Sequence, residues 1–163
     1  MIANKRIVAR VPVDIQIAEV TLLSKEEFEI AENNISAIRG WWWLRSPGFT
    51  LHNAALVYDY DDGLLYDHDV DDDRGCVRPA LRIVQTPYGL KLHDVIELAG
   101  YSWTIVCVLE NYCYALCNCA VGETYFREDW KAENANNYET SDVRKWLENW
   151  VKEVGIEITE KGT

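Results

Sequence analysis

The sequence predicts an α+β fold built from short antiparallel strands and two helices. Two observations predict the strands: apolar residues alternate over 6–20, and three short apolar segments separated by turn residues follow one another in the second half. A helix is predicted because apolar residues near the C-terminus recur at the spacing of one helix face. With 163 residues, 48% of them hydrophobic, the chain can bury a core, and we expect a single domain over 1–163.

The first half predicts one helix and several strands. Ser24 and Glu27 form a capping-box pattern, in which each side chain accepts a hydrogen bond from the other residue's backbone amide, so we expect a helix over 25–32. Strands are expected over 41–45, 54–60, 64–66 and 76–84, with a turn at 47–48, a hairpin turn at 61–63, a charged loop over 67–75 and a linker-like break over 85–89.

The second half predicts a three-stranded meander and then the clearest helix of the chain. The strands are expected over 94–98, 102–109 and 112–121, with turns at 99–100 and 110–111 and a polar loop over 127–139. The helix has an apolar stripe at positions i, i+3, i+4, i+7 and i+8, formed by Val143, Trp146, Leu147, Trp150 and Val151. Ser141 or Thr140 can cap its start, and Gly155 is a natural stop.

Residues 49–76 have an unusual composition. They contain eight of the chain's 12 Asp but none of its 15 Glu, and they also lack Lys, Gln, Met and Trp. These absent types make up 32 of the 163 residues, so about five are expected in the window under ordinary mixing. Asp and Glu interact similarly with solvent, so a demand for acidity alone does not exclude Glu. Randomising the adenines of an AAC or AAT codon reaches every residue type except these five, which favours a cause at the level of codons.

Three phrases lie within and beside this window: Trp42 to Gly48, Ala54 to Val57, and Val77 to Leu81. With them the chain resembles the variable proteins of diversity-generating retroelements in gut Firmicutes and their phages, which carry WWLRSPG, AA-x-V and VRPAL phrases. The runs at 126–132 and 138–145 also resemble that branch, so the resemblance covers residues from about 20 to 150. The resemblance implies a C-type-lectin-like fold, related to formylglycine-generating enzymes, that displays a diversified binding surface.

The order of these segments differs from that of the family. There, the strand meander and the Ser-Asp-x-Arg-Lys helix come before the LLS-x-EE helix and the WWLRSPG phrase, whereas here they come after. The resemblance therefore implies a circular permutation of one domain, with the lectin-like scaffold over 18–85 and its completion over 90–155. We expect 141–152 to pack against the segment from Val20 to Phe28.

The window supplies the candidate ligand contacts. Tyr offers rigid contact area, and His, Asn and Asp offer adaptable hydrogen bonds, so these types suit a binding surface. The candidates are Phe49, Leu51, His52, Asn53, Tyr58, Tyr60, Tyr66, His68, Asp71, Asp72, Asp73 and Arg74. The resemblance implies selective, non-covalent binding of a protein or glycan surface by a phage or prophage protein. The plainer alternative is an acidic surface loop with a few half-buried strand residues.

The charge of the window bears on its partners. The net charge is −11, and the window contributes eight Asp against one Arg, or −7. Such a surface repels phosphates, so no direct nucleic-acid binding is expected. It suits a basic protein, a cation, or mimicry of nucleic acid. A second hypothesis is therefore an acidic phage-borne inhibitor that imitates nucleic acid and blocks a basic groove.

The location is predicted from what the sequence lacks. The first 20 residues have no uninterrupted apolar core of a signal peptide, and no apolar run reaches the length of a membrane span. An odd count of five Cys fits a reducing compartment. We expect the cytoplasm or a phage particle and no membrane, and the sequence leaves the oligomeric state open.

Metal binding has two candidate sites. Asp67, Asp69 and Asp71 alternate and can converge on calcium, which gives a third hypothesis, a calcium-dependent lectin. A solvated acidic loop without a cofactor is the favoured expectation. The cysteines at 107, 113, 117 and 119 invite a zinc interpretation, in which strand alternation places Cys117 and Cys119 on one face. Buried thiols in the meander are the preferred interpretation.

Catalysis has little support in the sequence, and no enzyme is expected. The three His residues are isolated, and no nucleophile-and-base pattern is present. The run Trp41 to Trp43 can form an aromatic platform for a sugar, but at least two of its rings are expected in the core. Arg45 and Arg78 are expected to brace the scaffold through buried hydrogen bonds.

Overall fold

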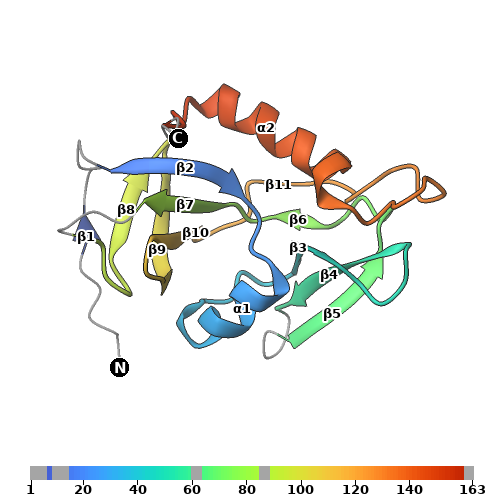
Figure 1. Cartoon of the computed structure of the whole chain (residues 1–163), viewed down its shortest axis with the longest axis horizontal. Helices are drawn as coiled ribbons and strands as arrows, with labels where there is room; N and C mark the ends of the chain where they lie inside the picture. The colour runs from blue at the N-terminus through green and yellow to red at the C-terminus, as the bar shows by residue number, and fades with distance from the viewer. Residues whose placement is uncertain (1–6, 9–14, 60–63, 85–88, 160–163) are drawn as a thin grey trace.

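The described residues of the protein form two sheets and two α-helices (Figure 1). The computed structural model describes residues 7–8, 15–59, 64–84 and 89–159. The six-stranded sheet has the order β1-β8-β9-β10-β7-β2, and the five-stranded sheet has the order β11-β6-β3-β4-β5. Among the described strands, the pairs β1–β8 and β3–β6 are parallel and the others antiparallel. The predicted α+β class, with mostly antiparallel strands and two helices, is confirmed.

The strands are short. The six-stranded sheet contains β1 (Ile7–Val8), β2 (Gln16–Thr21), β7 (Ala80–Val84), β8 (Val95–Leu98), β9 (Tyr101–Val108) and β10 (Tyr112–Cys117). The five-stranded sheet contains β3 (Trp41–Pro47), β4 (Asn53–Tyr58), β5 (Leu64–Asp69), β6 (Cys76–Val77) and β11 (Gly122–Glu123). The helices are α1 (Lys25–Ala31) and α2 (Asp142–Val154), with 3-10 turns η1 (Glu32–Asn34) and η2 (Tyr138–Thr140).

Both helices begin at the predicted caps. The Ser24 hydroxyl accepts from the Glu27 amide at 3.0 Å and the Glu27 carboxylate accepts from the Ser24 amide at 2.9 Å, which confirms the capping box. In α2, Ser141 is the cap and accepts from the Arg144 amide. Gly155 ends α2 in the left-handed conformation at φ 77°, which glycine adopts at little cost. Within the described ranges, no helix is both long and apolar enough to cross a membrane.

Several predicted boundaries are wrong. The predicted charged loop begins too early, because β5 continues pairing with β4 as far as Asp69 opposite Asn53. The predicted strand over 76–84 is two strands in different sheets, β6 and β7, which are separated where the chain crosses at Arg78 and Pro79. Pro79 has no N–H to donate to a continuous ladder. The hairpin turn at 61–63 and the break over 85–88 lie outside the described residues.

The meander matches the prediction closely until its third strand. The strand β10 ends at Cys117, four residues before the predicted end. Cys117 is buried and Cys119 is exposed, so the prediction that they share a strand face is wrong. The turn at Ala99 and Gly100 is present, with positive φ at both residues, which is the geometry of a tight hairpin.

The buried hydrophobic side chains form two clusters on opposite faces of the same strands. In β10, Ala115 belongs to the first cluster and Tyr114 to the second; in β4, Leu56 belongs to the first and Val57 to the second. This division follows from the alternation of side chains along a strand. Each cluster therefore contains side chains from both sheets.

The two helices cover different clusters. Figure 1 shows α2 alongside β2 and α1 below the end of β2. Leu147 of α2 packs in the first cluster, where Val20 also packs, so the predicted contact between 141–152 and the segment beginning at Val20 is confirmed there. It is wrong for Phe28, which lies in the second cluster with its ring centroid 6.0 Å from that of Trp42. The reason is that α1 packs beneath β3 and β9.

We expect Leu147→Ala to lower the free energy of unfolding by about 2 to 5 kcal/mol, because the side chain is fully enclosed between α2 and the sheet. Lys145→Ala, an exposed substitution on the same helix, should stay within about 0.5 kcal/mol of the wild type. Urea denaturation followed by circular dichroism measures both. Equal losses for the two variants would contradict the packing of α2.

Candidate ligand-binding site

The strands β3, β4 and β5 position the candidate residues. Tyr66 lies opposite Leu56 and Trp41 lies opposite Tyr58, while His68 lies opposite Ala54. Directly opposite residues of an antiparallel pair share a face of the sheet. Register and alternation together therefore bring Trp41, Leu56, Tyr58, Tyr66 and His68 to one face, although Trp41 precedes the other four by 15 or more residues in the sequence.

These side chains line a pocket of about 450 Å³, which we call the aromatic pocket. Two edge-to-face ring pairs line it: Trp41 with His68, at 5.5 Å between centroids, and Tyr58 with Tyr66, at 5.7 Å. Leu56 contributes a buried apolar surface. The remaining lining residues are Asp67, Asp72 and Arg74. The volume falls in the range typical of small-ligand sites.

The loop after β5 is organised around Asp72. Its carboxylate accepts from the Arg74 amide, from Nε at 2.9 Å and from Nη2 at 2.7 Å, and it also pairs with His68 Nε2 at 2.8 Å. The hydrogen bonds from Arg74 hold the pKa of Asp72 well below its ordinary value. Val70 anchors the loop: it is buried, its amide donates to His52, and its carbonyl accepts from Arg127. Asp72 thus holds the loop in shape while it lines the pocket.

The turn before β4 carries a second group of candidates. Phe49 and Leu51 are 93% and 62% exposed. The His52 ring packs edge-to-face against Trp130, and its Nδ1 lies 2.9 Å from the Trp130 carbonyl oxygen, to which it donates in the tautomer protonated at Nδ1. Asn53 is held by Asp69, whose carboxylate accepts from its side-chain amide at 3.0 Å. This turn is therefore held in place by neighbouring segments while its apolar tips face solvent.

The structure divides the predicted site residues into groups. Those in the aromatic pocket are Tyr58, Tyr66, His68, Asp72 and Arg74; those in the turn before β4 are Phe49, Leu51, His52 and Asn53; Asp71 and Asp73 are exposed on the loop after β5. Tyr60 lies outside the described residues. The sequence analysis did not select Leu56 or Trp130, and it considered Trp41 only within an aromatic platform for a sugar and Asp67 only as a calcium candidate. A Trp in a polar segment was the signal for Trp130, and cross-strand register places Trp41 in the pocket.

The calcium candidates do not gather around a common point. Asp67 accepts from the Phe49 amide, Asp69 accepts from Asn53, and Asp71 follows the buried Val70 into the loop. In the part of the chain that the structure describes, no group of three His, Cys, Asp or Glu side chains is arranged to hold a metal ion. This statement includes the cysteines considered for zinc.

The buried guanidinium of Arg78 lies next to Asp59, a residue of the window. Arg78 is 1% exposed; its Nε donates to the Cys117 carbonyl at 2.7 Å, and its guanidinium lies 5.0 Å from the centre of the Trp42 ring and 3.9 Å from the Asp59 carboxylate. Burial lowers the pKa of Arg78 to about 10, against the opposing influence of Asp59. Asp59 also accepts from Trp42 Nε1 at 2.8 Å and from the Ile38 amide. Asp59, although it belongs to the window, therefore stabilises the scaffold through these contacts.

Arg45 braces the other end of β3. It donates to the Leu22 carbonyl at 2.6 Å and makes two hydrogen bonds to the Glu27 carboxylate at 2.7 and 2.8 Å. Burial alone would raise the pKa of Glu27, but these bonds and the Ser24 amide hold it below its ordinary value. Burial and a hydrogen bond with Glu27 raise the pKa of Tyr114 to about 12.

The prediction that Arg45 and Arg78 brace the scaffold is confirmed, as is the prediction that two of the three consecutive Trp rings are in the core.

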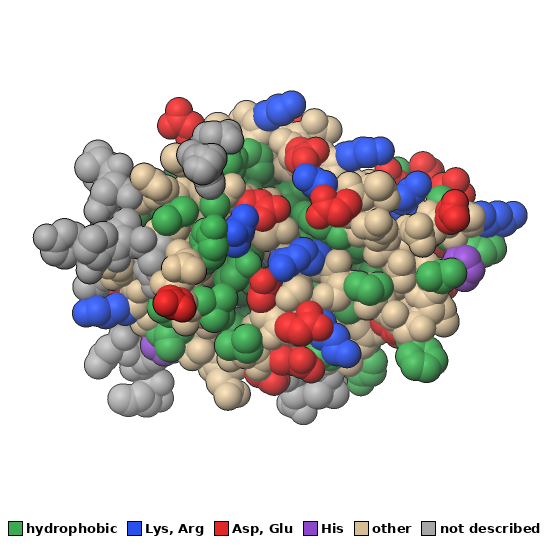
Figure 2. Space-filling model, in the orientation of Figure 1, with side chains coloured by type: hydrophobic (Ala, Val, Ile, Leu, Met, Phe, Trp, Pro, Cys, Tyr) green, Lys and Arg blue, Asp and Glu red, His purple; other side chains and the backbone are tan. Residues whose placement is uncertain are grey.

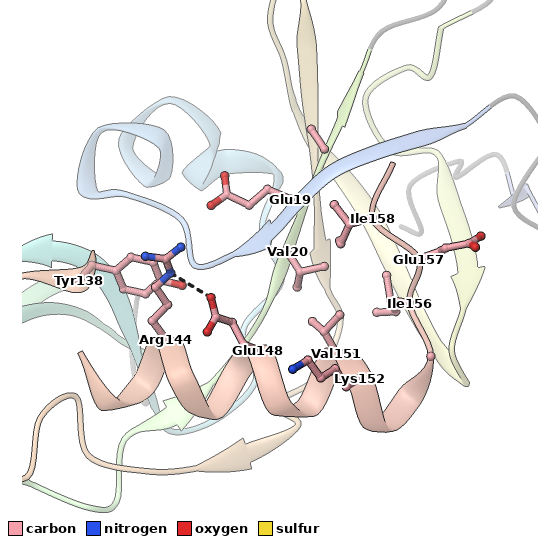
Figure 3. A pocket seen from close by; sticks show the side chains of 12 residues that line it. Glu19, Val20, Tyr138, Arg144, Glu148, Val151, Lys152, Ile156, Glu157 and Ile158 are labelled. Carbon is pink, nitrogen blue, oxygen red and sulfur yellow. Dashed lines mark ion pairs between the residues drawn. The ribbon is translucent and has the colours of Figure 1, made fainter. Parts of the chain in front are cut away.

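A larger hollow of about 960 Å³ lies between β2, α2 and the segment after α2 (Figure 3). Val20, Val151 and Ile156 point into it, and Arg144 pairs with Glu148 at its side. Figure 2 shows hydrophobic side chains in this region bordered by acidic and basic ones. The Thr159 amide donates to the Ile17 carbonyl, which draws the segment after α2 onto the edge of β2. The sequence reasoning did not foresee this hollow, and none of its lining residues belongs to the window.

We expect Gly75→Ala to destabilise the protein by about 1 to 3 kcal/mol. A Cβ there would lie 2.1 Å from Trp43 Nε1, which donates to the Thr124 carbonyl at 2.8 Å, so the buried indole would have to move. Asp73→Ala, an exposed change in the same loop, serves as the control and should cost less than about 0.5 kcal/mol. Thermal unfolding followed by tryptophan fluorescence compares them. Equal stability of the two variants would contradict the contact.

We expect Arg78→Met to cost about 3 to 5 kcal/mol, because it leaves the buried Asp59 carboxylate without its compensating charge. Adding Asp59→Asn should recover part of this loss, since the amide oxygen still accepts from Trp42. Urea unfolding of the two single variants and the double variant gives the coupling energy. Strictly additive losses would show that the two groups do not interact.

Comparison with known proteins gives no assignment for this site. No family model matches the sequence, and neither a curated protein nor a solved structure matches the chain. The α+β class rests on the observed sheets and helices. The relation to C-type lectins, the circular permutation and the retroelement origin stay predictions that rest on the sequence phrases.

Proposed function

We propose that the protein binds a protein or glycan ligand through the face formed by the aromatic pocket, the turn before β4 and the loop after β5. One observation carries the proposal. The compositionally biased window separates into buried side chains that hold the fold and exposed side chains that gather on one part of the surface. Ala54, Val57, Val70 and Gly75 are buried, whereas Phe49 and the pocket tyrosines are exposed.

This separation is what a diversified binding protein requires. Variation at exposed positions changes recognition at little cost in stability, while buried positions must be kept. We therefore propose that the window is the variable region of a diversity-generating retroelement, carried on a circularly permuted C-type-lectin-like scaffold and encoded by a phage or prophage. The binding itself needs no covalent step and no cofactor, because rings, amides and carboxylates supply the contacts.

The acidic inhibitor remains the second candidate, and one observation favours it. Asp67, Asp69, Asp71 and Asp73 recur at every second residue and are all exposed, which gives a row of carboxylates along β5 and its loop. A nucleic-acid mimic would bind its basic partner mainly through such charges, so its affinity would fall steeply with salt. The rings of the aromatic pocket have no part in that mechanism. A calcium-dependent lectin has no comparable support, since two of its three candidate ligands are engaged in hydrogen bonds.

The DNA sequence tests the variable-region proposal. We expect a near-identical template of codons 49–76 in the neighbouring DNA, with differences only at adenines. We further expect those differences at codons for exposed residues such as Phe49, Tyr66 and Arg74, and none at Gly75. Absence of a template would overturn the retroelement proposal and give the acidic inhibitor equal standing. Differences spread evenly over exposed and buried codons would contradict the division between scaffold and face.

Binding itself is tested on glycan and protein arrays. We expect Tyr66→Ser to weaken any array ligand at least about tenfold, because it removes a half-exposed ring of the pocket. Leu92→Ser, at an exposed apolar residue outside the window, is the matched control and should leave binding unchanged. The dependence of ligand affinity on salt concentration distinguishes binding through the pocket from nucleic-acid mimicry. Retention of binding by Tyr66→Ser together with its loss at high salt would favour nucleic-acid mimicry.

A further inference from the structure

We propose that the aromatic pocket receives a basic side chain, an arginine or a lysine, presented by a protein ligand. The inference rests on the proposed binding function and narrows the ligand from a protein or glycan surface to a protein with an exposed basic residue. Three properties of the pocket support it: its rings, its charge, and its apolar surface at Leu56.

The rings supply the first attraction. Trp41, Tyr58, Tyr66 and His68 line one space, and the two tyrosines are 38% and 53% exposed. A cation is attracted to the electron-rich face of Trp and Tyr rings within about 6 Å, and Trp is the strongest of these partners. The edge-to-face contacts between Tyr58 and Tyr66 and between Trp41 and His68 hold the rings in fixed orientations. A cation therefore meets an arrangement that needs little further ordering.

The charge of the pocket has the matching sign. The Asp72 carboxylate lines it, and Arg74 is the sole Lys or Arg among its described lining residues. Asp67 also lines the pocket, but its carboxylate accepts from the Phe49 amide on the opposite face of β5. Arg74 already makes two side-chain hydrogen bonds to Asp72, which compensate its charge. Asp71 and Asp73 are exposed in the adjoining loop, so the surroundings add further negative potential. Such a surface steers cations inward and repels acidic groups.

The shape suits a long side chain with a charged end. Lysine and arginine place apolar methylene stems along apolar surfaces while their charged ends stay near polar groups. Leu56 gives the pocket such an apolar surface, and the Asp72 carboxylate lies among its polar lining. A neutral sugar can stack on the same rings but gains nothing from the negative charge of Asp71 and Asp73 in the adjoining loop. The charge therefore favours a basic side chain over a glycan.

The test uses the full chain and capped tripeptides of the form Gly-X-Gly, with X as Arg, Lys, Gln or Glu, together with methyl glycosides of common hexoses. Binding is followed by the NMR shifts of the indole N–H groups. At low ionic strength we expect the Arg and Lys peptides to bind at least about tenfold more tightly than the Gln peptide. The Glu peptide should not bind, and added salt should weaken the basic peptides.

Three variants assign the binding to the pocket. Tyr66→Ala should reduce affinity for the basic peptides about tenfold, whereas Tyr66→Phe should keep it, because the ring face and not the hydroxyl makes the contact. Leu92→Ala removes an exposed apolar side chain that lies outside the window and does not line the pocket, and it should leave the affinity for the basic peptides unchanged. Circular dichroism verifies that each variant is folded, which is expected for exposed positions.

The outcomes separate this inference from the proposed function. Glycoside binding that Tyr66→Ala abolishes, without binding of basic peptides, would overturn the inference and leave the proposed function standing. Equal affinity for the Lys and Gln peptides, or basic-peptide binding that Tyr66→Ala does not weaken, would also overturn it. If no probe shifts an indole signal at all, the inference fails, and the template and array experiments alone decide the proposed function.

Discussion

The buried guanidinium of Arg78 joins the two sheets. The residue lies where the chain leaves β6 of one sheet for β7 of the other, and it donates to Cys117 at the end of β10. Its charge is balanced from the five-stranded sheet, by the Trp42 ring and by Asp59. Burying an unpaired charge here would destabilise the folded state. The arrangement therefore depends on all three partners, the Cys117 carbonyl, the Trp42 ring and Asp59. The face at the β4–β5 hairpin is built on this junction.

The junction explains how a window so unusual in composition remains compatible with a fixed fold. Asp59 belongs to the window by sequence but to the scaffold by structure, since it accepts from Trp42 and Ile38 and faces Arg78. Gly75, near the C-terminal end of the window, leaves no room beside Trp43 for any side chain. Asp59 and Gly75 therefore each contact a Trp ring of β3. The exposed side chains of β5 and its loop lie between these two buried positions in the sequence.

Local signals made the helices predictable, whereas long-range pairing limited the rest. The capping box at Ser24, the apolar stripe around Leu147 and the stop at Gly155 each act within a few residues, so the sequence alone located both helices. The division at Arg78 has one local signal, Pro79, which cannot donate to a continuous ladder, but that signal does not show that the two halves join different sheets. Trp41 likewise becomes part of the pocket through its register with Tyr58, which depends on a strand pairing across 17 residues. The composition of residues 49–76 indicated which segment forms the proposed face, but only the pairing of the strands shows which side chains lie together there.

The aspartates show why composition alone does not define a binding surface. Asp59 is buried against Arg78, Asp72 holds its loop through Arg74, and Asp67 accepts from the turn before β4. Each of these carboxylates makes a hydrogen bond or an ion pair that stabilises the fold. A substitution at any of them therefore changes the local backbone conformation as well as the charge. Tyr58 and Tyr66 differ, because their partly exposed rings pack edge-to-face against each other and line the pocket. If the face binds a ligand as proposed, recognition would change most freely at the tyrosines, while the carboxylates keep the turns and loops in shape.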